Sequence, residues 1–309
     1  MIKRAAVTGG GGFVGAALIE KLLNEGWDVA ALARDPARLA SADRVRVVRG
    51  ALEDESALAA IAQDADVFFH LAGVTHARRA GDYVSVNVAG AEAAARAAAR
   101  VGAKLVHASS MSARMPAVSP YAKSKFDSEA AAAQAGGPWL ALRLPAIYGP
   151  RDMVTLPFFR LVKSGFALAP KTPVPARASL LYVEDAAGAL LAAAESAATG
   201  AVYEVGDERP EGHAWSEIGA TLGEVLGKRP LALAVPRPAI ALYHGAVRAA
   251  EAAFSRPPSV REGQINEFFH PDWVARDNLL SAACGWRPQT PLQEGFAKTV
   301  RWYQEHDLL

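Results

Sequence analysis

A run of glycines lies near the start of the chain, between an apolar segment and a helical pattern. In VTGGGGFVGAALIEKLL, residues 7–23, glycines at positions 9, 12 and 15 would permit a tight turn, close approach of backbone amides to a pyrophosphate, and close packing of the helix on the sheet. The helix start adds backbone donors and partial positive charge. A flexible turn is the alternative, but the strand before and the helix after favour a dinucleotide-binding loop, formed by Gly9, Gly12, Phe13, Val14 and Gly15.

The first half of the sequence alternates short apolar runs with alanine-rich helical patterns. The expected strands are 3–8, 28–33, 45–49, 66–71, 104–108 and 139–144, and the expected helices are 13–25, 55–63, 83–100 and 120–134. Strands that are apolar along their whole length are typical of a parallel sheet covered by helices on both faces. The pattern therefore predicts an α/β fold with a Rossmann-type doubly wound parallel sheet.

The second half changes character after Pro150. Prolines punctuate shorter elements there, for example at positions 157, 170, 173 and 175. Regular patterns at 178–183, 184–198 and 201–205 nevertheless favour a return of the chain to the sheet. We expect a dinucleotide-binding domain at 1–150, with 178–206 returning to it, and a smaller, interwoven substrate-binding lobe over most of 151–309.

Charge and cysteine content exclude several classes of protein. The chain has 33 basic and 32 acidic residues, so it lacks the basic excess that binding to nucleic acid or to a membrane surface usually needs. No stretch reaches the roughly 18 uncharged apolar residues of a membrane span. The single cysteine, Cys284, excludes a disulfide framework and a cysteine-based metal site. We expect a cytoplasmic protein that binds neither nucleic acid nor a membrane.

Other potential ligands and surfaces have ordinary explanations. His70 and His107 lie in apolar strands, where a histidine is more often a core residue than a metal ligand. No group of His, Asp and Glu has a recognisable metal spacing, so no metal is expected. The amphipathic segment 239–254 is expected to be a helix of the substrate lobe or of a subunit contact rather than a membrane anchor.

The end of the second predicted strand bears on which dinucleotide binds. A ribose with a free 2′-hydroxyl is usually held by an acidic residue there. The sequence DVAALARDPARL instead places Arg34 at this position, with Arg38 nearby. A guanidinium suits a 2′-phosphate through charge-assisted hydrogen bonds. NADP is therefore favoured over NAD, the alternative being that Arg34 is a surface residue and Asp35 holds the ribose.

A tyrosine precedes two lysines in SPYAKSKFDSEA, residues 119–130. Lys125 is four residues after Tyr121, so on a helix the two side chains share a face, whereas Lys123 points elsewhere. An ammonium close to a phenol favours the phenolate, which makes Tyr121 a usable general acid or base. A polar helix start with solvated charges would explain these twelve residues equally well when taken alone.

Together these motifs resemble the extended short-chain dehydrogenase/reductase family, in the branch of the NAD-dependent epimerases and dehydratases. The similar segments are TGGGGFVG, HLAG at 70–73, SVNVAG at 85–90, YAKSK at 121–125, LRLPAIYGPRD at 142–152, and the C-terminal ACGWRPQTPLQEGFAKTVRWYQEH. Several motifs in the family's order are far more specific than any one of them, and the similarity spans nearly the whole chain.

The resemblance implies roles for further residues. Those implied to line or hold the cofactor are Leu71, Ala72, Gly73, Asn87, Lys125, Pro145 and Ile147. Lys125 would hydrogen-bond the nicotinamide ribose. A hydroxyl at the end of the fifth strand would orient the substrate oxygen, and Ser110 matches the family position best, with Ser109 and Ser112 as alternatives. A homodimer through the helices at 83–100 and 120–134 is also implied.

Three positions narrow the resemblance. Ala51 replaces an aspartate that often contacts adenine, so adenine is expected near the backbone of Leu52 or at another carboxylate. Pro145 stands where sugar-nucleotide epimerases tend to carry asparagine, which looks more like reductase-type members. Met111 follows Ser110 where dehydratases carry an acidic residue, and a methionine cannot act as an acid or base. Dehydration is therefore disfavoured.

The expected function is that of an NAD(P)-dependent oxidoreductase acting on a carbonyl or secondary alcohol of a small substrate. Tyr121 would be the acid or base, Lys125 would tune it, and Ser110 would position the oxygen. A nucleotide-sugar epimerase that works by transient oxidation is one alternative, and a non-catalytic NADP-binding accessory or sensor protein is another. The sequence does not reveal the substrate, because segment 151–270 carries no recognisable chemistry.

Overall fold

The architecture is known from a computed structural model that describes residues 2–39, 41–77, 79–254 and 263–309. Within these ranges a central sheet holds seven strands in the order β11-β6-β5-β4-β1-β2-β3, all paired in parallel. They are β1 (Arg4–Thr8), β2 (Asp28–Ala33), β3 (Arg46–Arg49), β4 (Val67–His70), β5 (Lys104–Ser110), β6 (Trp139–Leu144) and β11 (Ala201–Glu204). The strand order reverses between β1 and β4, which creates a crevice at the carboxyl ends of these strands.

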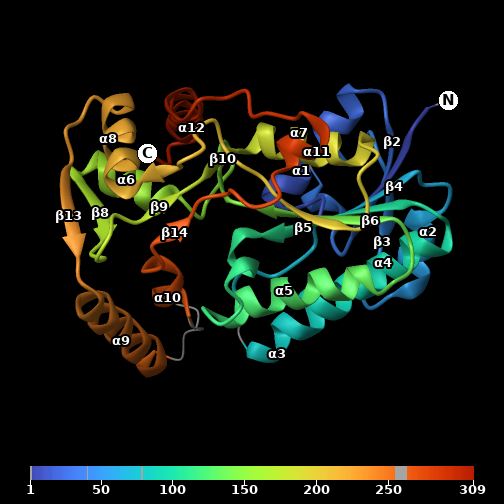
Figure 1. Ribbon diagram of the computed structural model, residues 1–309, viewed down its shortest axis with the longest axis horizontal. Helices are drawn as coiled ribbons and strands as arrows, with labels where there is room; N and C mark the ends of the chain where they lie inside the picture. The colour runs from blue at the N-terminus through green and yellow to red at the C-terminus, as the bar shows by residue number, and fades with distance from the viewer. Residues whose placement is uncertain (1, 40, 78, 255–262) are drawn as a thin grey trace.

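Helices cover both faces of this sheet (Figure 1). α1 (Phe13–Asn24), α7 (Val183–Glu195) and α11 (Leu280–Cys284) lie on one face, and α2 (Glu55–Ala62), α4 (Gly90–Arg100) and α5 (Pro120–Ala133) on the other. Leu18 of α1 and Leu190 of α7 pack with Val7 of the sheet, and Ile61 of α2 packs with Phe68 on the opposite face. Because both faces are buried, the strands are apolar throughout. The predicted α/β fold with a doubly wound parallel sheet is confirmed.

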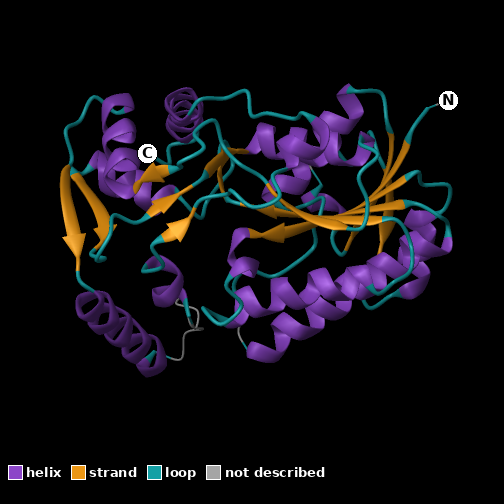
Figure 2. Cartoon of the chain, in the orientation of Figure 1, coloured by secondary structure: helices purple, strands orange, loops and turns teal. Residues whose placement is uncertain are grey.

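The chain builds a smaller lobe after β6, with short sheets and several helices (Figure 2). Its strands pair as β7 (Ala146–Tyr148) with β10 (Leu180–Tyr182), β8 (Phe166–Pro170) with β13 (Leu231–Val235), and β9 (Arg177–Ala178) with β12 (His213–Ala214) and β14 (Asp272–Trp273). Its helices are α6 (Leu156–Lys163), α8 (Trp215–Val225), α9 (Arg237–Ala253), α10 (Gln264–Phe268) and α12 (Leu292–Glu305). Aromatic rings of Tyr148, Phe159, Phe296 and Tyr303 form the centre of the lobe's core.

The two parts of the chain are interleaved. β11 leaves the small lobe and pairs with β6 at the edge of the main sheet, and α7 packs against α1. The division into a dinucleotide-binding domain at 1–150 with 178–206, and a substrate lobe over the rest, stays a prediction.

Two predicted elements differ from those observed. The helix expected at 83–100 is interrupted: α3 (Ala80–Tyr83) continues into a π-helical stretch (Val84–Ala89) before α4 begins. A widened turn of this kind changes the direction of the side chains it carries, and here it carries the buried Asn87. The strand expected at 178–183 is split between β9 and β10, because Leu180 donates its N–H to the Asp207 side chain, 2.8 Å away, rather than to a neighbouring strand.

The start of α5 is fixed by its own sequence. Ser119 caps the helix, accepting a hydrogen bond from the N–H of Ala122 at 3.0 Å, and Pro120 occupies the first turn. A capping serine followed by proline suits a helix N-terminus, because proline has the required φ and needs no partner for an N–H. This start sets the register of every residue on α5, including Tyr121 and Lys125.

Candidate active site

The glycine loop joins β1 to α1 beside the end of β4. Gly9 has a φ of 78°, and a Cβ there would lie 2.5 Å from the backbone nitrogen of Ala72. A Cβ at Gly15 would lie 2.8 Å from the carbonyl carbon of Gly9. Gly12 precedes α1 without a side-chain cap, so the first amides of this helix keep their donors for another partner. A loop that excludes side chains and ends at an uncapped helix start fits a pyrophosphate.

The next two residues of the loop open the helix. Phe13 and Val14 are both half-buried. Phe13 lines a groove of about 620 Å³ together with Pro150 and Val183, bordered by α1, α7 and α12. Val14 packs against the core cluster on the α1 face of the sheet.

The end of β2 presents two arginines. Arg34 follows the last residue of β2 and is exposed. The neighbouring Asp35 is engaged locally, since its side chain accepts a hydrogen bond from the N–H of Ala37 at 3.2 Å. Arg38 lies beside the glycine loop, where a Cβ at Gly11 would be 3.5 Å from that of Arg38. Arg38 thus lies next to the glycine loop, and Arg34 lies at the end of β2, where a residue for a 2′-phosphate was predicted.

Asn87 ties the segment after β4 to α5. Its buried side chain accepts from the N–H of Val74 at 2.8 Å and donates to the Val74 carbonyl at 3.0 Å. It also donates to the hydroxyl of Ser124 at 2.9 Å, and Ser124 donates to the carbonyl of Tyr121 at 2.7 Å. These bonds position the backbone after β4 relative to the first turn of α5.

The remaining residues predicted to contact the cofactor lie on several elements. Leu71 and Ala72 are half-buried at the end of β4, and Gly73 is exposed, with a hypothetical Cβ 3.1 Å from Asn87 Oδ1. Leu52 lies farther along the sheet and packs against Gly90 at the start of α4. Pro145 is buried directly after β6, and Ile147 is half-buried in β7.

The two lysines of α5 have opposite environments. Lys123 is exposed and pairs with Asp127 at 2.6 Å. Lys125 is buried, only 7% exposed, and donates from Nζ to the carbonyl oxygen of Ala108 on β5, 2.6 Å away. Burial lowers the pKa of Lys125 to about 8. Tyr121 is half-buried one turn earlier, with its ring 6.1 Å from that of Tyr83.

Two stacked histidines lie beneath this lysine. The rings of His70 and His107 are 5.3 Å apart and nearly parallel. His70 Nδ1 is hydrogen-bonded to Thr8 at 2.8 Å, and His107 Nε2 to Ser128 at 2.9 Å. Burial, reinforced by the Lys125 charge, lowers the pKa of His70 to about 3 and that of His107 well below its ordinary value. Both rings are therefore neutral core residues.

The two serines at the end of β5 point to opposite sides of the strand and have different partners. Ser109 is buried and donates to Glu129 at 2.5 Å, and Glu129 is held by a bidentate ion pair with Arg143, at 2.9 and 2.8 Å. Ser110 is half-buried, and its Oγ accepts from the N–H of Ser112 at 3.2 Å. A hydroxyl that accepts one bond still has a proton to donate. Because successive side chains of a strand point to opposite faces, the sequence alone could have predicted that Ser109 and Ser110 have different environments.

A further group of polar side chains lies outside this crevice. His213 is 5% exposed, and its Nε2 lies 3.5 Å from Asp207 and 3.6 Å from Glu208. Burial raises the pKa of the Asp207 carboxyl to about 6. Sequence reasoning did not single out Asp207, Glu208 and His213, because their spacing matches no common ligand pattern. The carboxylates also accept the N–H groups of Leu180 and Leu292, so they join β10 and α12 to the loop after β11.

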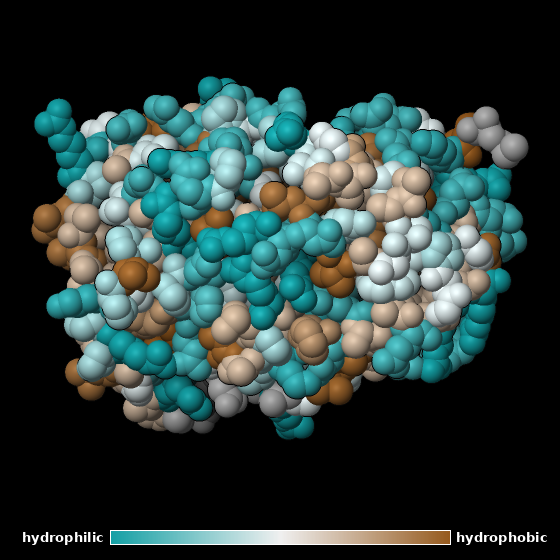
Figure 3. All heavy atoms as spheres, viewed as in Figure 1, coloured by the Kyte–Doolittle hydropathy of each residue, from teal (hydrophilic) through white to brown (hydrophobic). Residues whose placement is uncertain are grey.

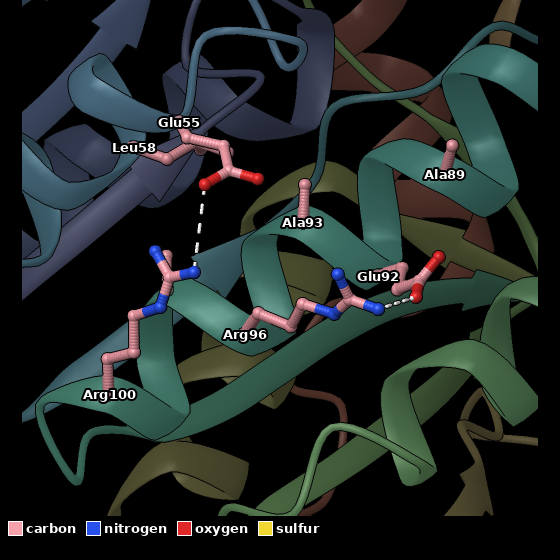
Figure 4. Close-up of a pocket in the computed structure, with 8 residues that line it drawn as sticks. Glu55, Leu58, Ala89, Glu92, Ala93, Arg96 and Arg100 are labelled. Carbon is pink, nitrogen blue, oxygen red and sulfur yellow. Dashed lines mark hydrogen bonds and ion pairs between the residues drawn. The ribbon is translucent and has the colours of Figure 1, made fainter.

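A hollow on the outer face of α2 and α4 is not part of the site (Figure 4). It has a volume of about 80 Å³ and is bordered by ion pairs, Glu55 with Arg100 at 3.6 Å and Glu92 with Arg96. Ligand pockets for drug-sized molecules are several times larger. These charges belong to the exposed sides of the two helices.

The chain is similar to known proteins over most of its length. The model of the NAD dependent epimerase/dehydratase family matches residues 5–206. Ceramide reductase of Caulobacter vibrioides is 38% identical over 305 residues, covering 97% of this chain and 94% of the relative. The 3-diazoavenalumate denitrifying reductase of a Streptomyces species is 30% identical over 243 residues, covering 69% of this chain and 79% of the relative.

Solved structures show the same fold at lower identity. The crystal structure of gox2253 superposes with a TM-score of 0.79 at 18% identity, covering 99% of each chain. MoeE5 in complex with UDP-glucose and NAD superposes with a TM-score of 0.74 at 22% identity, covering 98% of this chain and 99% of that one. Within the described ranges, no helix is both long enough and apolar enough to cross a membrane. The family match and the near full-length similarity to a reductase show that the chain belongs to the NAD dependent epimerase/dehydratase family, as an NAD(P)-dependent reductase or dehydrogenase.

Proposed function

We propose that the protein is an NADP-dependent reductase. Its substrate would be a ceramide-type lipid that carries a ketone, and the ketone would be reduced. The observation that carries this proposal is the 38% identity to a ceramide reductase across nearly the whole of both chains. A ceramide is an amide of a long-chain amino alcohol. The ketone carbon that reacts would lie close to the polar amide headgroup, and two long alkyl chains would extend from that headgroup. The proposed substrate is therefore small in its reactive part but strongly apolar overall.

The crevice at the carboxyl ends of the strands fits a dinucleotide. Gly9, Gly12 and Gly15 would hold the pyrophosphate at the start of α1, and Arg34 would contact the 2′-phosphate. The other residues assigned to the cofactor are Phe13, Val14, Leu52, Leu71, Ala72, Gly73, Asn87, Lys125, Pro145 and Ile147. A bound nicotinamide supplies the hydride for reduction, and the protein supplies position and proton transfer.

The chain's own residues then divide the remaining work. The Tyr121 hydroxyl donates its proton to the substrate's carbonyl oxygen as the carbonyl carbon is reduced to a secondary alcohol. Lys125 keeps a positive charge one helical turn away, which stabilises the phenolate that Tyr121 becomes. The Ser110 hydroxyl donates a hydrogen bond to the same oxygen and fixes its direction. Asn87 holds the start of α5 in register with the segment after β4.

This function is tested by incubating the purified protein with NADPH and a long-chain 3-keto amide in detergent micelles. We expect the absorbance of NADPH to fall in step with formation of the lipid alcohol, and NADH to be used less well. Epimerisation of a UDP-sugar with no net change in nicotinamide absorbance would contradict the proposal. Absence of turnover with the lipid, together with tight NADPH binding, would instead favour an accessory role.

We also propose that α4 and α5 form a homodimer contact. These helices lie side by side on one surface of the molecule (Figure 1). Phe126 on α5 is 43% exposed, and the ion pair between Lys123 and Asp127 lies on the same helix. A single protomer mass by light scattering at micromolar concentration would contradict this. A cytoplasmic location stays a prediction.

A further inference from the structure

The outer edge of the small lobe carries a local excess of positive charge. We use the name lobe edge for residues 163–174 and 226–254, which contain β8, β13 and α9. These segments hold six basic residues (Lys163, Lys171, Lys228, Arg229, Arg237 and Arg248) and one acidic residue, Glu251. The difference, six minus one, is +5, whereas the whole chain is +1. These two segments are therefore much more basic than the chain as a whole.

The same edge concentrates exposed apolar side chains. Fourteen large hydrophobic residues are exposed in the described part of the chain, and seven of them lie on the lobe edge. Leu231 of β13 is paired with Phe166 of β8, and both are exposed, at 60% and 43%. Leu242 and Tyr243 on α9 are 76% and 62% exposed. Clusters of exposed apolar residues on a soluble fold indicate a surface that binds a partner.

The shape of the edge places these residues at one extremity. α9 and β13 lie at the end of the lobe farthest from the seven-stranded sheet (Figure 1), and hydrophobic residues lie along this margin in the space-filling view (Figure 3). Most of β13 and most of α9 are exposed along their length. The two elements follow one another directly in the chain and lie near each other at this end of the lobe (Figure 1).

The lobe edge connects to the helix that carries Tyr121. Arg237, the first residue of α9, donates a hydrogen bond to Asn266 of α10. Asn266 in turn donates to the carbonyl of Val118 at 3.1 Å, and Glu267 accepts from Ser119, the cap of α5. One layer of side chains thus separates the edge from the first turn of α5.

We propose that the lobe edge docks on a bilayer that contains anionic phospholipids and delivers the lipid substrate to the crevice at Tyr121. This proposal rests on the proposed function, since only a membrane-resident substrate requires it. Basic residues attract anionic headgroups, each contributing about fivefold in binding. Leucine side chains enter the boundary between headgroups and acyl chains, and tyrosine prefers that interface. α9 is a helix of the small lobe, as expected for 239–254. The docking proposal departs instead from the expectation that the protein binds no membrane.

Flotation of the full-length protein with lipid vesicles tests this docking. We expect binding to vesicles of phosphatidylcholine with about one-quarter phosphatidylglycerol, weakening by more than tenfold with phosphatidylcholine alone or at high salt. Lys228→Glu with Arg229→Glu should weaken binding at least about 25-fold, and Leu242→Ser with Tyr243→Ser at least about tenfold. The matched controls lie elsewhere on the exposed surface: Arg44→Glu with Arg301→Glu, and Ile2→Ser with Val101→Ser. The controls should bind as the wild type does.

Three results would overturn the docking proposal. They are absence of wild-type binding to either vesicle, equal loss in the controls, and conversion of a dimer to a monomer by Leu242→Ser with Tyr243→Ser, which would make the edge a subunit contact. Reduction of a micellar lipid by a protein that ignores vesicles would reject docking and leave the proposed function intact. Vesicle binding with the expected variant pattern, but no oxidation of NADPH by the lipid, would support docking and reject the proposed function.

Discussion

Lys125 donates from Nζ to the carbonyl oxygen of Ala108, 2.6 Å away, across the junction of α5 with β5. The lysine is buried, and burial lowers its pKa to about 8, partly offset by the Glu129 carboxylate. A group that must be charged to assist Tyr121 is thus held where its charge is lost at mildly alkaline pH. This relationship sets the expected pH dependence of the enzyme.

We expect kcat/KM for reduction to fall as pH rises through about 8, because Lys125 then loses its proton in the free enzyme. The free energy of unfolding should change in the opposite direction to kcat/KM as pH rises. The unfolded lysine titrates near 10.4, so between about 8 and 10 the unfolded state binds more protons and this group's contribution to stability rises with pH. Rate profiles and denaturant titrations across this range measure both effects. An unchanged alkaline limb in Lys125→Met would contradict the assignment.

Tyr121→Phe removes the proposed proton donor without changing the shape of the ring. We expect kcat to fall at least about a hundredfold, since general acid catalysis contributes that much or more. The affinity for NADPH should stay at the wild-type value, because Tyr121 is not among the residues proposed to hold the cofactor. Fluorescence titration and steady-state kinetics separate the two. Equal loss of binding and turnover would point to a structural role for this tyrosine.

The fold was predictable because it depends on local patterns. The glycine loop, the apolar strands and the Pro120 start of α5 each specify their own element, and their order specifies the sheet. The π-helical turn at Asn87 was not predictable, since it depends on bonds to Val74 and Ser124, which lie 13 and 37 residues away. The Ser109–Glu129–Arg143 network was hidden for the same reason: its members come from β5, α5 and β6.

The adjacent serines should respond differently to substitution. Ser109→Ala leaves the buried Glu129 with one donor fewer, so we expect a loss of about 1–3 kcal/mol in the free energy of unfolding and wild-type kcat/KM. Ser110→Ala should lower kcat by about a hundredfold, because one donor to the substrate oxygen is lost, and cost about 1 kcal/mol as a lost cap. Unfolding titrations and kinetics on both variants decide. The reverse pattern of kcat would assign catalysis to Ser109.

Arg34→Ala tests the cofactor preference at the end of β2. The exposed guanidinium would make charge-assisted hydrogen bonds to a 2′-phosphate, and each is worth about 1.5–3 kcal/mol. We therefore expect the Kd for NADPH to rise about ten- to hundredfold and that for NADH to stay unchanged. Asp35→Ala is the matched control: Asp35 accepts from the N–H of Ala37 and so has a local structural role, and its loss should not change the preference between the two cofactors. Equal effects of Arg34→Ala on the two cofactors would contradict the 2′-phosphate contact. Selective loss of NADH binding in Asp35→Ala would show instead that Asp35 holds the ribose.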